Sequence, residues 1–255
     1  MMFFKIFAYI HYQCKRKRWV HSAFVYDFII SVLKQKKFTN NRIHIEKIGK
    51  QLLKIQQKSE VRDSQVNRKY GLVASQRNRS RKRLCNSVKV GCILHNLVRH
   101  YHLCSIVELG TSLGIDTVCL AKATPNATVF TVELNPEMAE IASKVFEQLH
   151  LTNIELINTD SDAAIALFAD KSKDIDLFFI NSAHSCDSIS RYFSFVKNHA
   201  KNNTIFILSD IYCSKEMRNV WKKIQADPNV SISIDLYAVG IVFFRKGIVK
   251  QNFTL

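Results

Sequence analysis

The sequence lacks the signatures of a disulfide-rich or zinc-binding protein. It contains seven cysteines, an odd number, but no C-x-x-C pair and no histidines near them at zinc-ligand spacing. This pattern excludes a disulfide framework and a structural zinc site, and it is typical of scattered thiols in a reducing compartment. We therefore expect a cytoplasmic protein.

The sequence also lacks an export signal and a membrane-crossing segment. Its first residues are apolar, but Lys5 interrupts them, no small-residue cleavage site follows, and the basic cluster KRKR comes after the apolar run instead of before it. A run this short cannot span a bilayer. Apolar residues beside a basic cluster leave a weak membrane-surface contact open, although we favour docking of this segment against the protein's own body.

Acidic residues are scarce in the first 100 positions. These positions carry 23 Lys and Arg against 4 Asp and Glu, a net charge of +19, whereas residues 101–255 carry 14 against 17, a net charge of −3, and the two parts sum to +16. A basic region of this kind can meet RNA, anionic lipid or an acidic substrate, and it can equally be a solvated face. The charge asymmetry alone does not choose among these partners.

The N-terminal part has the pattern of a helical extension followed by a polar linker. Apolar residues recur at helical spacing after Ser22, which predicts a helix capped by Ser22 and ending near Lys36, and a second helical pattern spans 45–55. Residues 56–85 are polar and basic, which is typical of a flexible linker or lid. From residue 86 an apolar stripe predicts an amphipathic helix. We divide the chain into a basic helical extension (1–55), a linker or lid (56–85) and a main domain (86–255).

Beyond residue 103, strand-like and helix-like segments alternate. Strands are predicted at 105–109, 128–133, 153–157, 175–180 and 204–209. Helices are predicted at 113–123, 136–149, 161–169, 187–199 and 214–226. Two further strand-like runs, 230–236 and 239–245, end the pattern. This alternation predicts the α/β class, with a seven-stranded, mostly parallel sheet that is covered on both faces and ends in an antiparallel hairpin.

The segment VELGTSLGIDT, residues 107–117, stands where the first predicted strand turns into its helix. Ligands of doubly wound sheets bind at this edge of the sheet. Gly110 and Gly114 allow positive φ and let a ligand approach the main chain without a Cβ in the way. A dinucleotide fingerprint, G-x-G-x-x-G, would need glycine where this chain has Ser112 and Ile115. A pyrophosphate-binding turn is therefore disfavoured.

The spacing of Glu108, Gly110, Ser112 and Gly114 resembles motif I of class I S-adenosylmethionine-dependent methyltransferases. Residues 103–253, with shorter segments such as VHSAFVYDFI near residue 20, look like a bacterial O-methyltransferase-like family of that class. The resemblance implies a Rossmann-like methyltransferase fold and S-adenosyl-L-methionine as cofactor. It implies four further contacts to the cofactor besides motif I: Glu133 to the ribose hydroxyls, Asp160 and Ser161 to the adenine, and Asn181.

The loops after the fourth and fifth predicted strands, FFINSAHS and ILSDIYCS, would face the transferred methyl group. Similar families commonly place an aspartate where this chain has Asn181, and two acidic or amide residues where it has Ser209 and Asp210. Because hard cations prefer carboxylate oxygens, we expect no catalytic metal. His184 and Asp210 are the candidate base and its orienting partner.

These patterns predict a methyltransferase that acts on an oxygen, or less favourably a nitrogen, of a small-molecule acceptor by in-line transfer. Two alternatives stay open at this point. The basic N-terminal region would suit a tRNA or rRNA methyltransferase that binds nucleic acid. The replacements at Asn181 and Ser209 would suit a non-catalytic module that binds S-adenosylmethionine. A homodimer is also left open.

Overall fold

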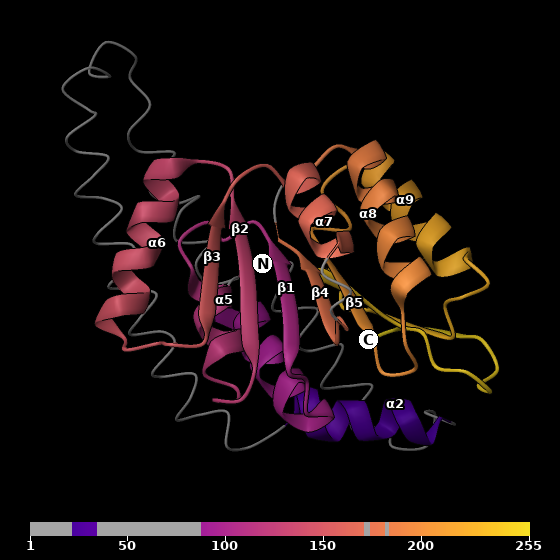
Figure 1. Ribbon diagram of the computed structural model, residues 1–255. Helices are drawn as coiled ribbons and strands as arrows, with labels where there is room; N and C mark the ends of the chain where they lie inside the picture. Colours follow the sequence, from indigo (N-terminus) through magenta and orange to yellow (C-terminus); the bar gives the residue numbers. More distant parts are fainter. Residues whose placement is uncertain (1–21, 35–87, 171–173, 182–183) are drawn as a thin grey trace, which may run out of the picture.

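The centre of the computed structural model is one sheet in the order β3-β2-β1-β4-β5-β7-β6-β8 (Figure 1). The structure describes residues 22–34, 88–170, 174–181 and 184–255. Among these, β7 alone runs antiparallel to its neighbours, and the other pairs are parallel. The strands are β1 (Ser105–Leu109), β2 (Thr128–Glu133), β3 (Ile154–Asn158), β4 (Leu177–Ile180), β5 (Ile205–Ser209), β6 (Ile232–Asp235), β7 (Val239–Phe243) and β8 (Gln251–Thr254).

Helices cover both faces of the sheet because each parallel connection must cross over it. One face packs against α7 (Ser161–Asp170), α8 (Cys186–His199) and α9 (Lys215–Ala226). The opposite face packs against α5 (Ile115–Ala121), a helix over residues 88–101, and α2 (Ala23–Phe28) with its π-helical continuation η1 (Ile29–Leu33). The remaining helix, α6 (Pro136–Gln148), lies beside β3 at the edge of the sheet (Figure 1).

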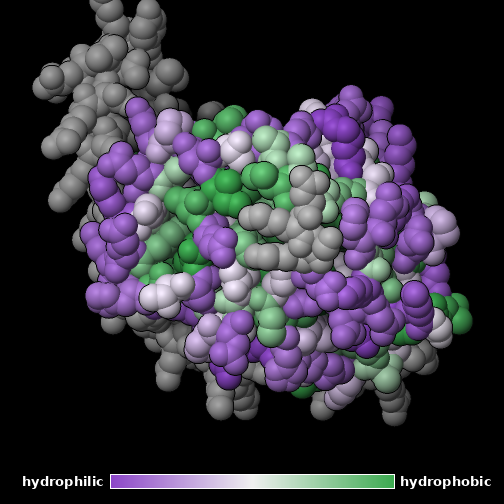
Figure 2. All heavy atoms as spheres, viewed as in Figure 1, coloured by the Kyte–Doolittle hydropathy of each residue, from purple (hydrophilic) through white to green (hydrophobic). Residues whose placement is uncertain are grey.

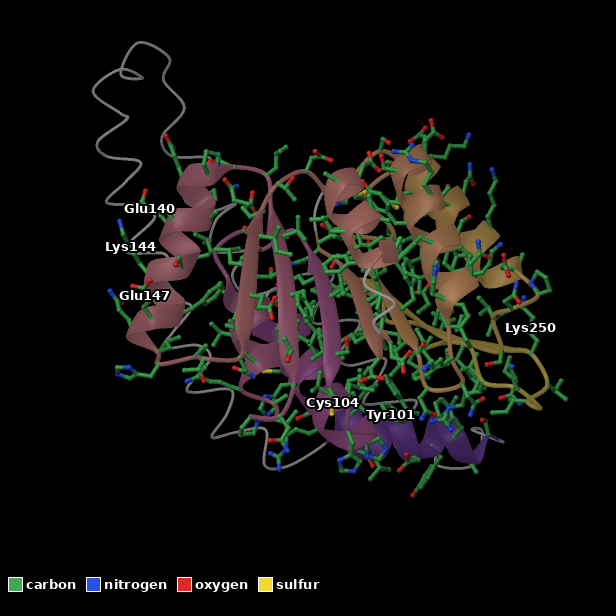
Figure 3. All side chains as sticks on the ribbon, in the orientation of Figure 1. Tyr101, Cys104, Glu140, Lys144, Glu147 and Lys250 are labelled. Carbon is green, nitrogen blue, oxygen red and sulfur yellow. The ribbon has the colours of Figure 1, made fainter. Side chains whose placement is uncertain are left out.

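The helix α6 shows how the sequence sets these packing faces. Its buried residues Ala142, Val145 and Phe146 contact α5, whereas Glu140, Lys144 and Glu147 point outwards in Figure 3. Asn135 caps the first turn by accepting hydrogen bonds from two backbone N–H groups of α6. Such a cap contributes about 1 kcal/mol to stability, so the start of α6 is defined locally while its orientation comes from the apolar stripe.

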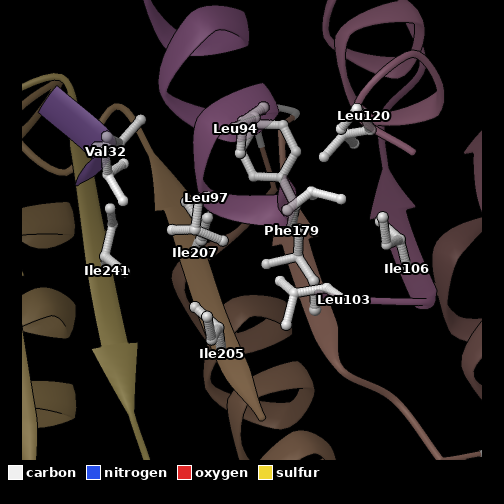
Figure 4. Close-up of a cluster of buried hydrophobic side chains, with 14 of the residues drawn as sticks. Val32, Leu94, Leu97, Leu103, Ile106, Leu120, Phe179, Ile205, Ile207 and Ile241 are labelled. Carbon is white, nitrogen blue, oxygen red and sulfur yellow. The ribbon is translucent and has the colours of Figure 1, made fainter. Parts of the chain in front are cut away.

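The largest hydrophobic core lies between the sheet and the helices at 88–101 and α2, and Figure 4 shows part of it. Leu94, Leu97 and Val98, which belong to the predicted stripe, are at most 1 % exposed. Fully burying a side chain of this size contributes about 1.5–3 kcal/mol. The predicted amphipathic helix is confirmed, and its stripe fixes it to the sheet.

Residues 22–34 pack onto the same core as the sheet. Ser22 caps α2 as predicted, by accepting a hydrogen bond from the Val25 N–H. Val25 and Phe28 are fully buried, and the Asn96 amide donates to the Val32 carbonyl oxygen over 2.9 Å. The helical structure ends at Leu33, three residues before the predicted end. This part of the N-terminal extension is therefore continuous with the main domain.

Five strands and five helices of the predicted alternation are present to within a few residues, and so is the antiparallel hairpin of β6 and β7. The predicted number of seven strands is wrong, because the structure adds β8, which pairs in parallel with β6. The predicted helix at 45–55 and the linker at 56–85 lie outside the described residues. In the part of the chain that the structure describes, no helix is long and apolar enough to cross a membrane.

Candidate functional site

The turn after β1 adopts the left-handed backbone conformation that its glycines favour. The φ angles are 99° at Gly110 and 73° at Gly114, and Ser112 between them has a φ of 51°. The N–H groups of Gly110 and Thr111 both donate to the Val132 carbonyl oxygen, at 2.9 and 3.1 Å. A Cβ at Gly114 would lie 2.6 Å from the Phe146 ring. The turn is therefore narrow, and only glycine fits at position 114.

Glu133, the last residue of β2, borders this turn. One carboxylate oxygen accepts from the Ser112 N–H at 2.8 Å, and the other accepts from the Asn135 N–H at 3.0 Å. A carboxylate oxygen has a second lone pair, so both oxygens retain an acceptor position. The Asn158 amide donates to the Glu133 carbonyl oxygen at 2.7 Å and fixes the neighbouring backbone. Glu133 thus stands half-buried beside the turn with its carboxylate held in place.

Glu108 lies beneath the turn instead of facing it. It is fully buried on β1, and one carboxylate oxygen accepts from the Thr117 hydroxyl at 2.5 Å and from the Thr131 hydroxyl at 2.7 Å. The Thr131 hydroxyl oxygen lies 2.6 Å from that of Thr111. Because the Thr131 proton is used on Glu108, Thr111 must be the donor in this pair. Glu108 therefore anchors the turn from below through a chain of hydroxyl groups.

A second buried carboxylate, Asp116, lies in the first turn of α5. The Asn181 amide donates to it at 3.0 Å and also lies 3.3 Å from the Gly110 carbonyl oxygen as a donor. Burial raises the pKa of Glu108 to about 8, and the Asp116 carboxylate adds to this shift. Burial likewise raises the pKa of Asp116 to about 7, against the effect of the Asn181 hydrogen bond. Two interacting acids therefore support the turn from inside.

Asp160 and Ser161 lie at the carboxyl end of β3, where α7 begins. The Asp160 carboxylate accepts from the Ala163 N–H at 2.9 Å, which caps α7. Asp160 is exposed and Ser161 is half-buried. On the face shown in Figure 2, hydrophobic residues gather over β2 and β3, between the hydrophilic residues of α6 and α8.

His184 lies just before α8, at the carboxyl end of β4. Its ring packs edge-on against Tyr192 at a centroid distance of 5.2 Å. Burial lowers the pKa of His184 below its ordinary value, although the nearby Asp162 carboxylate acts in the opposite direction. The imidazole is therefore neutral at physiological pH and can accept a proton.

Asp210 begins the loop after β5, and the terminal hairpin holds this loop. Asp210 is exposed and has a φ of 55°, and its N–H donates to the Ala238 carbonyl oxygen at 2.8 Å. Two residues later, the Tyr212 ring stacks on Tyr237 with an interplanar angle of 12°. The Tyr212 hydroxyl donates to buried Asp235 at 2.6 Å. The loop at residues 209–214 is thus fixed to the turn between β6 and β7.

Asp235 collects further hydrogen bonds behind this loop. The Trp221 indole N–H donates to the same carboxylate oxygen as Tyr212, at 3.1 Å, and the Tyr237 N–H donates to the other oxygen at 2.8 Å. The hydrogen bond to Asp235, helped by burial, raises the pKa of Tyr212 to about 12. Tyr212 therefore keeps its proton, and the contact persists at any physiological pH.

Comparison with known proteins identifies the domain that carries this turn. Residues 107–211 match the family model of a methyltransferase domain. This part of the chain is similar to a methyltransferase domain. No curated protein sequence gives a match. The fold is that of class I methyltransferases, as the solved structures below also show.

Three solved structures share the fold of this chain. An O-methyltransferase from Bacillus cereus, solved with S-adenosylhomocysteine, has a TM-score of 0.56 at 17 % identity, over 77 % of this chain and 90 % of that one. The O-methyltransferase TomG from Streptomyces achromogenes, solved with S-adenosylmethionine, has a TM-score of 0.53 at 17 % identity, over 61 % and 79 %. A Podospora anserina methyltransferase bound to S-adenosylhomocysteine has a TM-score of 0.54 at 14 % identity, over 61 % and 78 %.

The fold brings most of the predicted site residues to one edge of the sheet. The turn residues, Glu133, Asp160, Asn181, His184 and Asp210 all follow the carboxyl ends of β1 to β5. Three further residues that bind Glu108 or Asn181 were not among the predicted site residues: Asp116, Thr117 and Thr131. Within the described residues, no group of three or more His, Cys, Asp and Glu side chains could hold a metal ion.

Proposed function

We propose that this chain binds S-adenosylmethionine over the turn at residues 110–114 and transfers its methyl group to an oxygen of a small-molecule acceptor. The methyltransferase family and the ligand-bound neighbours support S-adenosylmethionine as the methyl donor. The observation that carries the proposal is the position of Glu133, whose carboxylate is held beside the glycine turn by the Ser112 and Asn135 N–H groups. When bound, the cofactor supplies an electrophilic methyl group on a sulfonium.

The residues around the turn fit this cofactor in shape and charge. Gly110 and Gly114 give the turn its left-handed backbone, and the two charged residues predicted to contact the cofactor from β2 and from the end of β3, Glu133 and Asp160, are carboxylates. A sulfonium cation is favoured near carboxylates. In the proposed role, Glu133 accepts hydrogen bonds from the ribose hydroxyls, and Asp160 and Ser161 border the adenine.

Methyl transfer requires alignment more than acid–base chemistry, because the methyl group moves in line from sulfur to the nucleophile. A protonated hydroxyl acceptor additionally needs a base. We assign this role to His184, whose neutral imidazole can take the proton, and we assign Asp210 to the orientation of the base or the acceptor. The fixed loop at 209–214 would hold the acceptor in place.

The other functions left open by the sequence have less support. Most of the Lys and Arg residues of the N-terminal region, which would favour tRNA or rRNA, lie outside the described part, and no contact among the described residues supports nucleic-acid binding or a homodimer. The division into extension, linker and main domain also remains a proposal. Within it, the tight packing of residues 22–34 favours an extension that is part of the folded body.

Calorimetry with S-adenosylmethionine and S-adenosylhomocysteine tests cofactor binding. Glu133→Ala should weaken the binding of both by about 1–3 kcal/mol, because it removes charged hydrogen-bond acceptors. Glu155→Ala is the matched control, since Glu155 is exposed on the adjacent strand β3. Equal affinity of the two variants would contradict the assignment of Glu133.

Turnover of a labelled methyl donor then identifies the acceptor class. The label should enter small molecules of a metabolite extract and not total RNA, and His184→Gln should slow this transfer by about 100-fold without changing cofactor affinity. Label in RNA alone would support the alternative that uses the basic region. Binding without any turnover would support the non-catalytic module.

A further inference from the structure

The side chain of Asn181 connects three parts of the structure at the carboxyl end of the sheet. It follows β4 directly, and its backbone N–H donates to the Leu109 carbonyl oxygen at 2.8 Å. Its amide NH2 is the donor to Asp116 of α5 and to the Gly110 carbonyl oxygen, at 3.0 and 3.3 Å. Its amide oxygen accepts from the Ser209 hydroxyl at 3.4 Å. One side chain therefore joins the glycine turn, α5 and the end of β5.

The contact with Asp116 is the one that the surrounding protein cannot replace. Among the described residues, Asn181 is the only side chain that donates a hydrogen bond to Asp116, and the other Asp116 oxygen is buried without a hydrogen bond. The titratable groups that face this region are Glu108 from β1, Cys119 and Lys122 from α5, and Cys92 from the helix at 88–101. Only Lys122 among them carries a positive charge, and it acts on the pKa of the Cys119 thiol, which it lowers.

The neutral amide is therefore chemically required at position 181. A carboxylate there would bring a third acid beside Asp116 and Glu108 and would offer no donor to either Asp116 or the Gly110 carbonyl oxygen. An apolar side chain of the same size would leave Asp116 buried without any hydrogen bond. Both changes would act on the turn through Gly110.

We propose that Asn181 is a positioning residue, whose amide locks the glycine turn to the buried Asp116 and to the end of β5 so that the methyl donor meets a preformed turn. This inference rests on the proposed function, because it concerns the same site. It places the effect of Asn181 in the shape of the turn before the cofactor arrives. Through the hydroxyl of Ser209, the last residue of β5, Asn181 also joins the glycine turn to the loop that follows β5.

The test exchanges the hydrogen-bond donor and the hydrogen-bond acceptor between positions 181 and 116. Three variants are compared with the wild type: Asn181→Asp, Asp116→Asn, and the double variant that carries both changes. In the double variant, an amide at 116 can donate to a carboxylate at 181, and the pair keeps its hydrogen bond and its single charge. Asn181→Leu serves as a variant that cannot donate at any pH.

Affinity for S-adenosylhomocysteine is measured by calorimetry from about pH 5.5 to about pH 8.5, on either side of the range where such buried acids titrate. Relative to wild type, Asn181→Asp should bind about tenfold more weakly at the high end and recover towards the low end, where a protonated carboxyl can donate. Asn181→Leu should be weaker throughout. The double variant should bind more tightly than Asn181→Asp at the high end, because it restores the hydrogen bond between positions 116 and 181. It should stay weaker than wild type, because its carboxylate at 181 offers no donor to the Gly110 carbonyl oxygen.

A double variant no better than Asn181→Asp, or a loss in Asn181→Asp that does not depend on pH, overturns the inference. Thermal unfolding of the ligand-free variants separates this outcome from a failure of the proposed function. If the wild type binds neither cofactor form, the proposed function fails, whereas a melting temperature restored by the exchange still supports the lock between 116 and 181.

Discussion

Two parts of the proposed site are built in different ways: the donor end, where residues 108–133 form the proposed site for the methyl donor, and the acceptor end, the loop at 209–214 that is proposed to hold the acceptor. At the donor end, residues 108–133 supply the turn, its glycines and the hydroxyl chain from Thr111 to Glu108, and Asn181 joins them from the end of β4. At the acceptor end, the loop at 209–214 is held by Asp235, Tyr237 and Ala238 of the terminal hairpin. Buried hydroxyl and carboxyl groups therefore support the turn, whereas an aromatic stack and one buried carboxylate of the terminal hairpin hold the loop at 209–214.

The largest effect is expected at the donor end, from Gly114→Ala. The new Cβ would lie 2.6 Å from Phe146 at a φ of 73°, so both overpacking and an unfavourable backbone oppose it. Together these should lower the free energy of unfolding by about 2–5 kcal/mol, measured by denaturant titration.

The matched control for Gly114→Ala is Gly247→Ala. Gly247 has a φ of 75°, but no atom lies within 4 Å of the added Cβ. It should lose only about 1–2 kcal/mol, from the backbone conformation alone. Equal losses at the two glycines would mean that Phe146 does not shape the turn.

The next effect concerns the buried acids of the donor end. Since the pKa of folded Glu108 is raised to about 8, well above its ordinary value, the folded state holds a proton that the unfolded state releases. The stabilisation is fully present below about pH 4 and is lost as the pH rises towards 8. The free energy of unfolding of the wild type should therefore decrease as the pH rises through this range. Glu108→Gln cannot titrate at this position, so its decrease should be smaller by at least about 1.4 kcal/mol.

Chemical denaturation at a series of pH values checks this prediction. The variant keeps an acceptor oxygen for the Thr117 and Thr131 hydroxyls, so its hydroxyl chain to Thr111 should survive. Parallel pH profiles of wild type and variant would show that Glu108 does not carry the titration.

The smallest effect is expected at the acceptor end, from Tyr212→Phe. The variant keeps the stack on Tyr237 but removes the hydrogen bond to Asp235, which still has two donors. Stability should fall by about 1 kcal/mol. The KM for the acceptor should rise, whereas the affinity for S-adenosylmethionine should stay unchanged.

Tyr26→Phe is the control for that experiment, because Tyr26 is exposed on α2, away from both ends of the site. A Tyr212→Phe variant that weakened cofactor binding as strongly as acceptor binding would remove the distinction between the two ends.

Much of the fold follows from the sequence because its patterns are local. The stripe at 90–101, the cap at Ser22 and the alternation of strands and helices each depend on neighbours a few residues apart. The strand β8 gives no such signal, since Gln251–Thr254 is only four residues long and three of them are polar. It becomes a strand because β6 offers an open edge, and no local pattern reveals that edge.

The site shows the same limit. The glycines follow from their spacing and Glu133 from the resemblance to a known family, but the role of Glu108 depends on the register in which Glu108 pairs with Thr131 across β1 and β2. Likewise, Asp116 meets Asn181 only because β4 lies next to β1. Spacing along the chain does not contain the lateral order of strands, so these partners appear only in three dimensions.

Trp221 provides an optical probe of the acceptor end. It is one of two tryptophans in the chain, is 2 % exposed, and lies so close to Gly240 that an added Cβ there would come within 2.6 Å of its ring. Its indole N–H shares one oxygen of Asp235 with Tyr212. Movement of the loop when an acceptor arrives should therefore change the emission of this residue, and stopped-flow fluorescence can follow substrate capture without any label.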